Sequence, residues 1–429
     1  MIKYLLLLLS LGFLMNCQTE NLEPSSNAFF KIYGGQYQEE GIDLLETDDG
    51  GFIIVGYTTS LSKGEYKDIF VVKTNEFGLA EWTKILLSNN GLNDEAVSIK
   101  RTFESGENYV VVGTSGINKT DSIQSNIFAC KISVDGNVFW ENTYDTFIRN
   151  ESDTIKNRAD FGIDVQLRLD GEMVIVGNSL LNDGYEIIAF KVNANGDRID
   201  DMFTFGLESE LGGVVNDISN RVINNENPLV SASGLILGST NASLSGNDEG
   251  DNVYMLYYSD NLTNINEFTF GGPGNQRADD VAWSLDGGYM VLTTNDYNES
   301  GFGNINLIKV NDNLETQSTL INGNDLNFGV NEEVTRGRSI IRSNSRYILA
   351  AEYKERPNAD SDILLMETDQ AGQVKWFQFY GGDNSDKINS VILTQNGSIA
   401  FTGMLSFVDS DQVTKMILVK TDPNGKIIP

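Results

Sequence analysis

Residues 29–85 read FFKIYGGQYQEEGIDLLETDDGGFIIVGYTTSLSKGEYKDIFVVKTNEFGLAEWTKI. Short apolar runs rich in β-branched and aromatic residues alternate here with polar turns such as DDGG and NEFG. Runs of this kind are typical of strands, and an Asp-Gly pair supplies the positive φ angles of a tight hairpin turn. The stretch therefore predicts one four-stranded, up-and-down antiparallel sheet.

The same pattern recurs along the rest of the chain, at intervals of roughly 50–65 residues. The later copies carry, at the place of FIIVGYT, the segments YVVVGTS, MVIVGNS, GLILGST, YMVLTT, YILAAEY and IAFTGML. One such sheet leaves apolar surface on both faces, and radial stacking of the copies buries it. We therefore predict an all-β fold, a single seven-bladed β-propeller over residues 28–429, with copies four and six the most diverged.

The two ends of the repeat region predict how the ring closes. Residues 29–35, FFKIYGG, match residues 376–382, WFQFYGG, position for position. The seventh copy reaches residues 426–429, KIIP, where its last strand is due. We expect the segment from Phe29 to supply that strand and to close the ring by pairing with the last blade.

The first residues, MIKYLLLLLSLGFLMNC, contain one cation, an apolar run and then Cys17. This order is similar to the bacterial lipoprotein signal, in which the Cys is lipidated, although Asn16 replaces the usual small residue. The resemblance implies a signal peptide over 1–16, a lipidated Cys17 with a tether over 17–27, and export to the outer membrane, in its periplasmic or surface leaflet. The alternative is an ordinary cleaved signal with an incidental Cys. Cys130 is expected to be a buried strand thiol.

Composition excludes several classes of function. The chain has 61 acidic and 30 basic residues, a net charge of −31, and no His. Such a surface repels nucleic acid and anionic lipid, so we expect membrane contact through the lipid anchor only, and a monomer. Without His, Ser-His-Asp triads and imidazole metal sites are excluded. No cofactor is required, and Ca²⁺ is the metal that would suit the available oxygen ligands.

The repeat itself resembles a known group of proteins. The YGG segments at 33–35 and 380–382, the DGG turn at 49–51, the IIVGYT strand at 53–58 and the KTNEFGLAEW hairpin at 73–82 are similar to repeats of exported propeller-like proteins from Bacteroidota-type bacteria. The resemblance covers residues 28–429. It implies the fold, and it leaves the function open because these repeats are mostly scaffold.

Acidic residues gather where each copy enters its first strand, which in a propeller lines the central channel. Our candidate ligand-binding residues at this channel mouth are Glu40, Asp43, Asp94, Asp164, Asp279, Asp280, Glu333 and Asp386. The same segments also contain Glu39, Glu95, Asp160, Asp217 and Glu332. Crowded carboxylates raise one another's pKa or recruit a cation. The alternative, which we favour, is a solvated ring with capping and turn roles.

Arg336 and Arg338 are two further candidates at the mouth. Two residues apart on a strand, they point to the same side. A pair of guanidinium groups is suited to binding a carboxylate or an acidic sugar. The alternative, again the favoured one, is pairing with Glu332, Glu333 or a neighbouring blade.

These observations favour a non-enzymatic binding module for a glycan or an envelope protein. Specificity would lie in the loops between second and third strands, at 61–67, 116–125, 241–251 and 354–362. One alternative is a carbohydrate-active enzyme, a glycoside hydrolase or lyase, that uses channel carboxylates. Another is a structural spacer. Trp82, Trp140 and Trp376 share one repeat position, so we expect them to pack between blades rather than to bind sugar.

Overall fold

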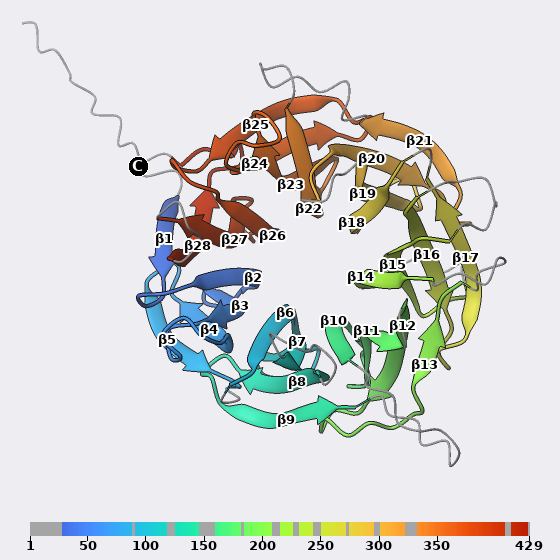
Figure 1. Cartoon of the computed structure of the whole chain (residues 1–429), viewed down its shortest axis with the longest axis horizontal. Helices are drawn as coiled ribbons and strands as arrows, with labels where there is room; N and C mark the ends of the chain where they lie inside the picture. Colours follow the sequence, from blue (N-terminus) through green and yellow to red (C-terminus); the bar gives the residue numbers. More distant parts are fainter. Residues whose placement is uncertain are drawn as a thin grey trace, which may run out of the picture.

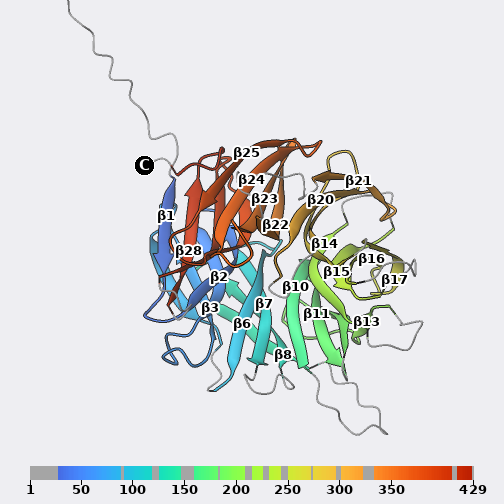
Figure 2. The same ribbon diagram turned by 45° about the horizontal axis from the view of Figure 1, so that its top comes forward.

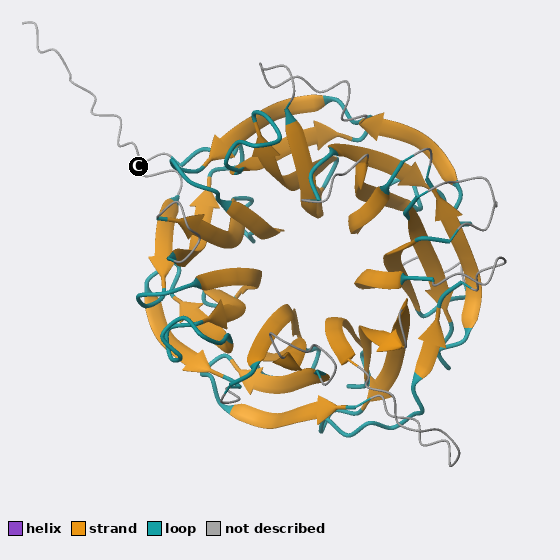
Figure 3. Ribbon diagram, in the orientation of Figure 1, coloured by secondary structure: helices purple, strands orange, loops and turns teal. Residues whose placement is uncertain are grey.

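The computed structural model describes residues 28–87, 91–117, 125–145, 159–181, 184–207, 215–225, 231–242, 250–271, 274–295, 301–321, 333–407 and 413–427. Within them, every regular element is a strand, and the strands form seven four-stranded antiparallel sheets. The sheets stand around a central channel (Figures 1 and 3). The predicted all-β, seven-bladed propeller is confirmed.

The blades follow one another along the chain, each running from the channel outwards. Blades 1 to 3 are β2 (Glu39–Glu46), β3 (Phe52–Thr58), β4 (Asp68–Thr74), β5 (Ala80–Ile85); β6 (Asn93–Arg101), β7 (Asn108–Ile117), β8 (Asn126–Ser133), β9 (Val138–Tyr144); and β10 (Ala159–Leu167), β11 (Met173–Leu181), β12 (Gly184–Val192), β13 (Phe203–Phe205). Blades 4 and 5 are β14 (Asp217–Asn224), β15 (Gly234–Thr240), β16 (Asn252–Tyr258), β17 (Asn264–Phe270); and β18 (Gln276–Trp283), β19 (Tyr289–Asn295), β20 (Asn304–Val310), β21 (Thr316–Ile321). Blades 6 and 7 are β22 (Val334–Ser343), β23 (Arg346–Lys354), β24 (Asp362–Asp369), β25 (Val374–Tyr380); and β26 (Lys387–Leu393), β27 (Ile399–Ser406), β28 (Thr414–Thr421) with β1 (Phe29–Tyr33).

The last blade contains strands from both ends of the described chain. Its strand order is β26-β27-β28-β1, and β1 pairs antiparallel with β28 from Phe29 opposite Lys420 to Tyr33 opposite Met416. The Phe29 ring also meets Phe52 of blade 1 edge-on, with 6.1 Å between ring centroids. The predicted closure of the ring by the N-terminal strand is therefore confirmed.

The hydrophobic core lies between the blades rather than inside any one of them. Every residue of β3 and β4 is buried, because neighbouring sheets cover both of their faces. One cluster, for example, joins Val55 and Val71 of blade 1 to Val111 and Cys130 of blade 2. Cys130 is a free, buried thiol, as predicted.

The outer strands contact the next blade through their tryptophans. The indole N–H of Trp82 donates to the Val134 carbonyl at 3.0 Å, and that of Trp140 donates to the Ala194 carbonyl at 2.9 Å. Both acceptors lie in the turn between the third and fourth strands of the following blade. The expected packing role of these two residues is confirmed.

The inner strands run through the thickness of the ring, as the tilted view shows for β6 and β10 (Figure 2). The chain enters each inner strand on one face, here called the upper face, and leaves it on the lower face. In the described part of the chain, no helix has the length and apolar character needed to cross a bilayer. Cys17 and the predicted leader and tether lie outside the described residues.

Candidate binding site in the central channel

Each inner strand contains a β-bulge at the same place in the repeat, and β6 has a second register shift at Asp94. In β2, for example, the pairing with β3 skips Ile42 between Gly41 and Asp43. A bulge presents two successive side chains on one side of a strand, and here that side is the channel. We call the skipped residues the lining positions: Ile42, Val97, Ile163, Asn220, Asp279, Arg338 and Asn389. The residues that follow them are the ring positions: Asp43, Ser98, Asp164, Arg221, Asp280, Ser339 and Ser390.

The ring-position carboxylates connect neighbouring blades. Asp43 accepts hydrogen bonds from the Ser390 hydroxyl of blade 7 at 2.8 Å and from the Ile99 amide of blade 2 at 3.0 Å. Asp164 of blade 3 does the same, accepting from the Ser98 hydroxyl at 2.6 Å and from the Val222 amide at 3.1 Å. Each carboxylate therefore joins its own blade to both neighbours.

Asp280 of blade 5 completes this pattern with an ion pair. It accepts from Arg221 Nε of blade 4 at 2.8 Å, and from the Ser339 hydroxyl and the Ile340 amide of blade 6 at 3.1 and 2.9 Å. Asp43, Asp164 and Asp280, three of the residues predicted at the mouth, thus lie part-way down the channel. They act as cross-links between blades 7, 1 and 2, blades 2, 3 and 4, and blades 4, 5 and 6.

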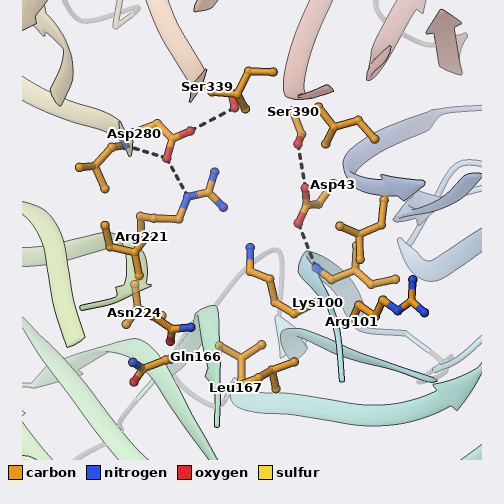
Figure 4. Close-up of a pocket in the computed structure, with 18 of the residues that line it drawn as sticks. Asp43, Lys100, Arg101, Gln166, Leu167, Arg221, Asn224, Asp280, Ser339 and Ser390 are labelled. Carbon is orange, nitrogen blue, oxygen red and sulfur yellow. Dashed lines mark hydrogen bonds and ion pairs between the residues drawn. The ribbon is translucent and has the colours of Figure 1, made fainter. Parts of the chain in front are cut away.

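Below the ring positions the channel opens into a cavity of about 420 Å³, the lower vestibule (Figure 4). Its wall is largely apolar and includes Leu45, Leu167 and Ile223. Lys100 Nζ lies 3.3 Å from Asp164 Oδ1, and Arg221 Nη1 lies 3.8 Å from Asp164 Oδ2. Burial opposes the ionisation of Asp164, but these two cations, together with the hydrogen bonds from Ser98 and Val222, lower its pKa. The charges at this end of the channel are paired with one another.

Above the ring positions lies a second cavity of about 310 Å³, the upper vestibule. The lining positions give its wall two different sides. Blades 1 to 3 contribute the aliphatic Ile42, Val97 and Ile163. Blades 5 and 6 contribute charged residues, Asp279 and Arg338, and the two sides are separated by amides of blades 4 and 7.

Three arginines, Arg277, Arg336 and Arg338, and two carboxylates lie on the charged side. Arg338 donates from Nε to Glu352 at 2.5 Å, and Glu352 is 1% exposed. Arg277 donates from Nε to Asp279 at 2.9 Å. Both acids are thereby occupied by a guanidinium group other than that of Arg336. The cluster carries one positive charge more than its acids neutralise.

Arg336 is the residue with that extra charge. Within the described part of the chain it forms no hydrogen bond, and its Nε is buried without an acceptor. Burial, together with the nearby charges of Arg338 and Arg277, lowers its pKa to about 10. A Cβ added at Gly301 would lie 3.1 Å from Arg277 Nη1 and 3.4 Å from Arg336 Cζ, so the two guanidinium groups lie side by side around this glycine. A buried donor without a partner is costly, and the guanidinium group that contains this donor belongs to a residue of the upper vestibule wall.

Asp279 is held inside this arginine cluster. It accepts a hydrogen bond from the Thr294 hydroxyl at 2.5 Å as well as from Arg277. Burial raises the pKa of Asp279, although Arg277 and Thr294 oppose the shift. Its role here is to hold Arg277 at the wall of the vestibule.

The other predicted acids lie at the upper rim and bind protein groups. Glu40 accepts from the Tyr57 hydroxyl at 2.9 Å and from the Asn389 amide at 2.8 Å. Asp94 accepts from the Gly116 amide at 2.9 Å, and Asp386 accepts from the Gly382 amide at 2.7 Å. These bonds tie the upper ends of the inner strands to the second strand, to the neighbouring blade and to the preceding loop.

Two predicted residues of the β21–β22 connection remain. Glu333 is described, and it interacts with Tyr353 of β23 rather than with Arg336. Glu332 lies outside the described residues, as do parts of the loops predicted at 116–125 and 241–251. In the part of the chain that is described, no group of three or more acidic or Cys side chains is arranged to hold a metal ion.

Sequence reasoning found Arg336 and Arg338 but missed Arg277, Arg221 and Lys100. Aligning the copies on their inner strands would have placed Arg277 at the same repeat position as Arg336. The amides of blades 4 and 7, Asn220 and Asn389, were missed for a similar reason. Their importance depends on the bulge, which turns that one position towards the channel.

Comparison with known proteins gives fold-level similarities only. No family model and no curated protein sequence matches the chain. Among solved structures, the polysaccharide lyase Uly1 matches with a TM-score of 0.49 and 9% identity over 91% of each chain. Puromycin hydrolase matches with a TM-score of 0.41 and 11% identity over 86% of this chain, which spans 58% of that protein. An endo-arabinase from Bacteroides thetaiotaomicron matches with a TM-score of 0.36 and 13% identity, over 58% of this chain and 89% of the other. Because these TM-scores and identities are low, we assign no activity or ligand of these proteins to this chain.

Proposed function

We propose that this protein is a binding module whose upper vestibule holds a carboxylate group of its ligand. The observation that carries the proposal is Arg336, a guanidinium group with a buried, unpartnered Nε beside two further arginines. Planar guanidinium groups bind carboxylates through paired, charge-assisted hydrogen bonds. A chain with a net charge of −31 would repel such a ligand elsewhere on its surface, so the cluster would also direct where the ligand binds.

Binding is favoured over catalysis by the way the channel acids are used. Asp280 is occupied by Arg221 and Ser339, and Asp279 is occupied by Arg277 and Thr294. A glycosidase needs one carboxyl group as an acid and a second as a base or nucleophile, each free to approach the substrate. These two acids instead orient arginines and join blades, which suits a rigid recognition site.

We further propose that Cys17 anchors this module to the outer membrane through its acyl chains. The support is the leader sequence, with its apolar run directly followed by Cys17. Lipidation of the Cys would hold the propeller at the envelope, where acidic glycans and envelope proteins are within reach. Labelling of the expressed protein with a radioactive fatty acid tests this anchor, and a Cys17→Ser variant that keeps the label would contradict it.

The binding proposal is tested by calorimetric titration of the chain lacking residues 1–17, which retains all seven blades. The probes are citrate and trigalacturonate. We expect Arg336→Met to weaken binding of both by about 10- to 100-fold, the value of one or two charge-assisted hydrogen bonds. Arg101→Met is the matched control, because Arg101 pairs with Asp48 at an exposed site outside the upper vestibule. Equal binding by wild type and Arg336→Met, or no binding of either probe, would overturn the proposal.

A further inference from the structure

The wall that faces the arginines is aliphatic. Val97 lies on β6 of blade 2, and in a ring of seven blades the members opposite blade 2 are blades 5 and 6. Figure 1 shows β6 across the channel from β18 and β22, the strands that carry Arg277 and Arg336. Ile42 and Ile163, at the same repeat position in blades 1 and 3, extend this wall on both sides of Val97. A ligand in the vestibule would therefore meet cations on one side and aliphatic carbon on the other.

The residues between these two sides are matched amides. Asn220 of blade 4 donates from Nδ2 to the Ala278 carbonyl, and Asn389 of blade 7 donates from Nδ2 to the Gly41 carbonyl at 2.8 Å. Asn389 uses both Nδ2 N–H groups, on Glu40 and Gly41, and Asn220 uses one of its two, so each amide has an Oδ1 that can accept a hydrogen bond from a ligand. The vestibule thus offers carboxylate-binding donors, hydroxyl-binding acceptors and an aliphatic surface.

Few classes of carboxylate use all three of these features. A small polyanion would use the arginines and leave the aliphatic wall in water. A uronate residue presents a carboxylate and hydroxyls at the edges of its ring and C–H groups on its faces. The cavity of about 310 Å³ lies at the lower end of the range of small-molecule sites, about 300–1,000 Å³. It would accommodate a short end of a chain rather than a long internal stretch.

Resting on the proposed function, we infer that the ligand is a uronate-containing glycan whose terminal residue enters the upper vestibule. Its carboxylate binds Arg336, and one C–H face of its ring packs against Ile163 and Val97. Hydroxyl groups at the flanks donate to Asn220 and Asn389. The same arginines would also attract an acidic peptide, whose flexible side chains depend less on the aliphatic wall.

The test compares two probes on the chain lacking residues 1–17. Trigalacturonate has the ring and the carboxylate, whereas citrate has carboxylates alone. We expect Ile163→Thr to weaken trigalacturonate binding about 5- to 10-fold, since it removes apolar contact area, and to leave citrate binding unchanged. Ile392→Thr is the matched control, because Ile392 lines the lower vestibule and the same substitution there should change neither affinity.

The outcomes separate this inference from the proposed function. If Arg336→Met weakens both probes and Ile163→Thr weakens neither, the carboxylate site stands and the uronate assignment is wrong. If a glutamate-rich peptide binds at least as tightly as trigalacturonate and is displaced by citrate, the assignment is also wrong. If neither citrate nor trigalacturonate binds the wild type, both proposals fail.

Discussion

Both vestibules of the channel have aliphatic residues in their walls, but their charged residues differ in how they are paired. The lower vestibule is larger, about 420 against 310 Å³, yet its cations Lys100 and Arg221 pair with the ring-position carboxylates Asp164 and Asp280. Arg221 there binds Asp280 and lies near Asp164. Arg336 in the upper vestibule has no such acceptor within the described residues. Charge balance, rather than volume, therefore distinguishes the structural network from the vestibule where we propose that a ligand binds.

We expect the largest change in the free energy of unfolding from Arg221→Met, which removes the cation between the ring-position carboxylates. Removing this cation would leave the buried Asp280 and Asp164 without a shared partner. Breaking one side of a buried ion pair costs about 3–5 kcal/mol of folding free energy. The measurement is the free energy of unfolding from urea titration at pH 7.

Arg101→Met is the control for this loss. Arg101 pairs with Asp48 at an exposed site, where such a pair contributes about 1 kcal/mol or less. If the two variants lose similar amounts of stability, the ring-position network does not cross-link the blades, and the contrast between the vestibules disappears.

In the upper vestibule, we expect an arginine-to-methionine substitution to stabilise the protein rather than destabilise it. Arg336→Met removes a guanidinium group whose Nε is buried without an acceptor. Leaving such a donor unpaired costs about 1–3 kcal/mol, so the variant should gain about 1 kcal/mol or more in the free energy of unfolding. The same urea titration measures it, in the absence of carboxylate buffers. A loss of stability would mean that the native protein already satisfies Arg336.

The smallest effect is a pH dependence of the folding stability, which comes from an acid at the upper rim whose pKa is shifted in the opposite direction to that of an acid at a ring position. Burial raises the pKa of Asp386, at the rim, to about 6, whereas the pKa of Asp164 in the ring is lowered. A raised pKa means that the folded state holds the proton more tightly than the unfolded state does. The stability that Asp386 contributes is then fully present below its ordinary pKa, about 4, and is lost as the pH rises through about 6.

Asp386→Asn should remove this dependence. The free energy of unfolding of the variant, measured relative to wild type, should be about 1 kcal/mol higher at pH 7.5 than at pH 4.5. This is less than the maximum that a pKa shift of about two units allows. Urea titrations at the two pH values give the comparison. Parallel changes in the wild type and the variant would show that Asp386 does not titrate in this range.

The sequence by itself determined the architecture. Apolar runs, Asp-Gly turns and the match of 29–35 with 376–382 were sufficient to predict seven blades and the pairing of β1 with β28, because hydrophobic pattern and turn chemistry are local properties. The pattern also marked the three tryptophans as packing residues. Local patterns and their repetition along the chain were enough for these inferences.

The sites were decided only by the tertiary structure. The sequence grouped Asp43, Asp164, Asp280 and Asp386 as one acidic mouth, but a bulge of one residue separates rim, lining and ring positions at different depths. Whether a charge is paired depends on side chains from other blades, such as Arg221 with Asp280, which lie 59 residues apart. Closing the ring brings these residues together, and so it alone determines that Arg221 is paired while Arg336 has no acceptor within the described residues.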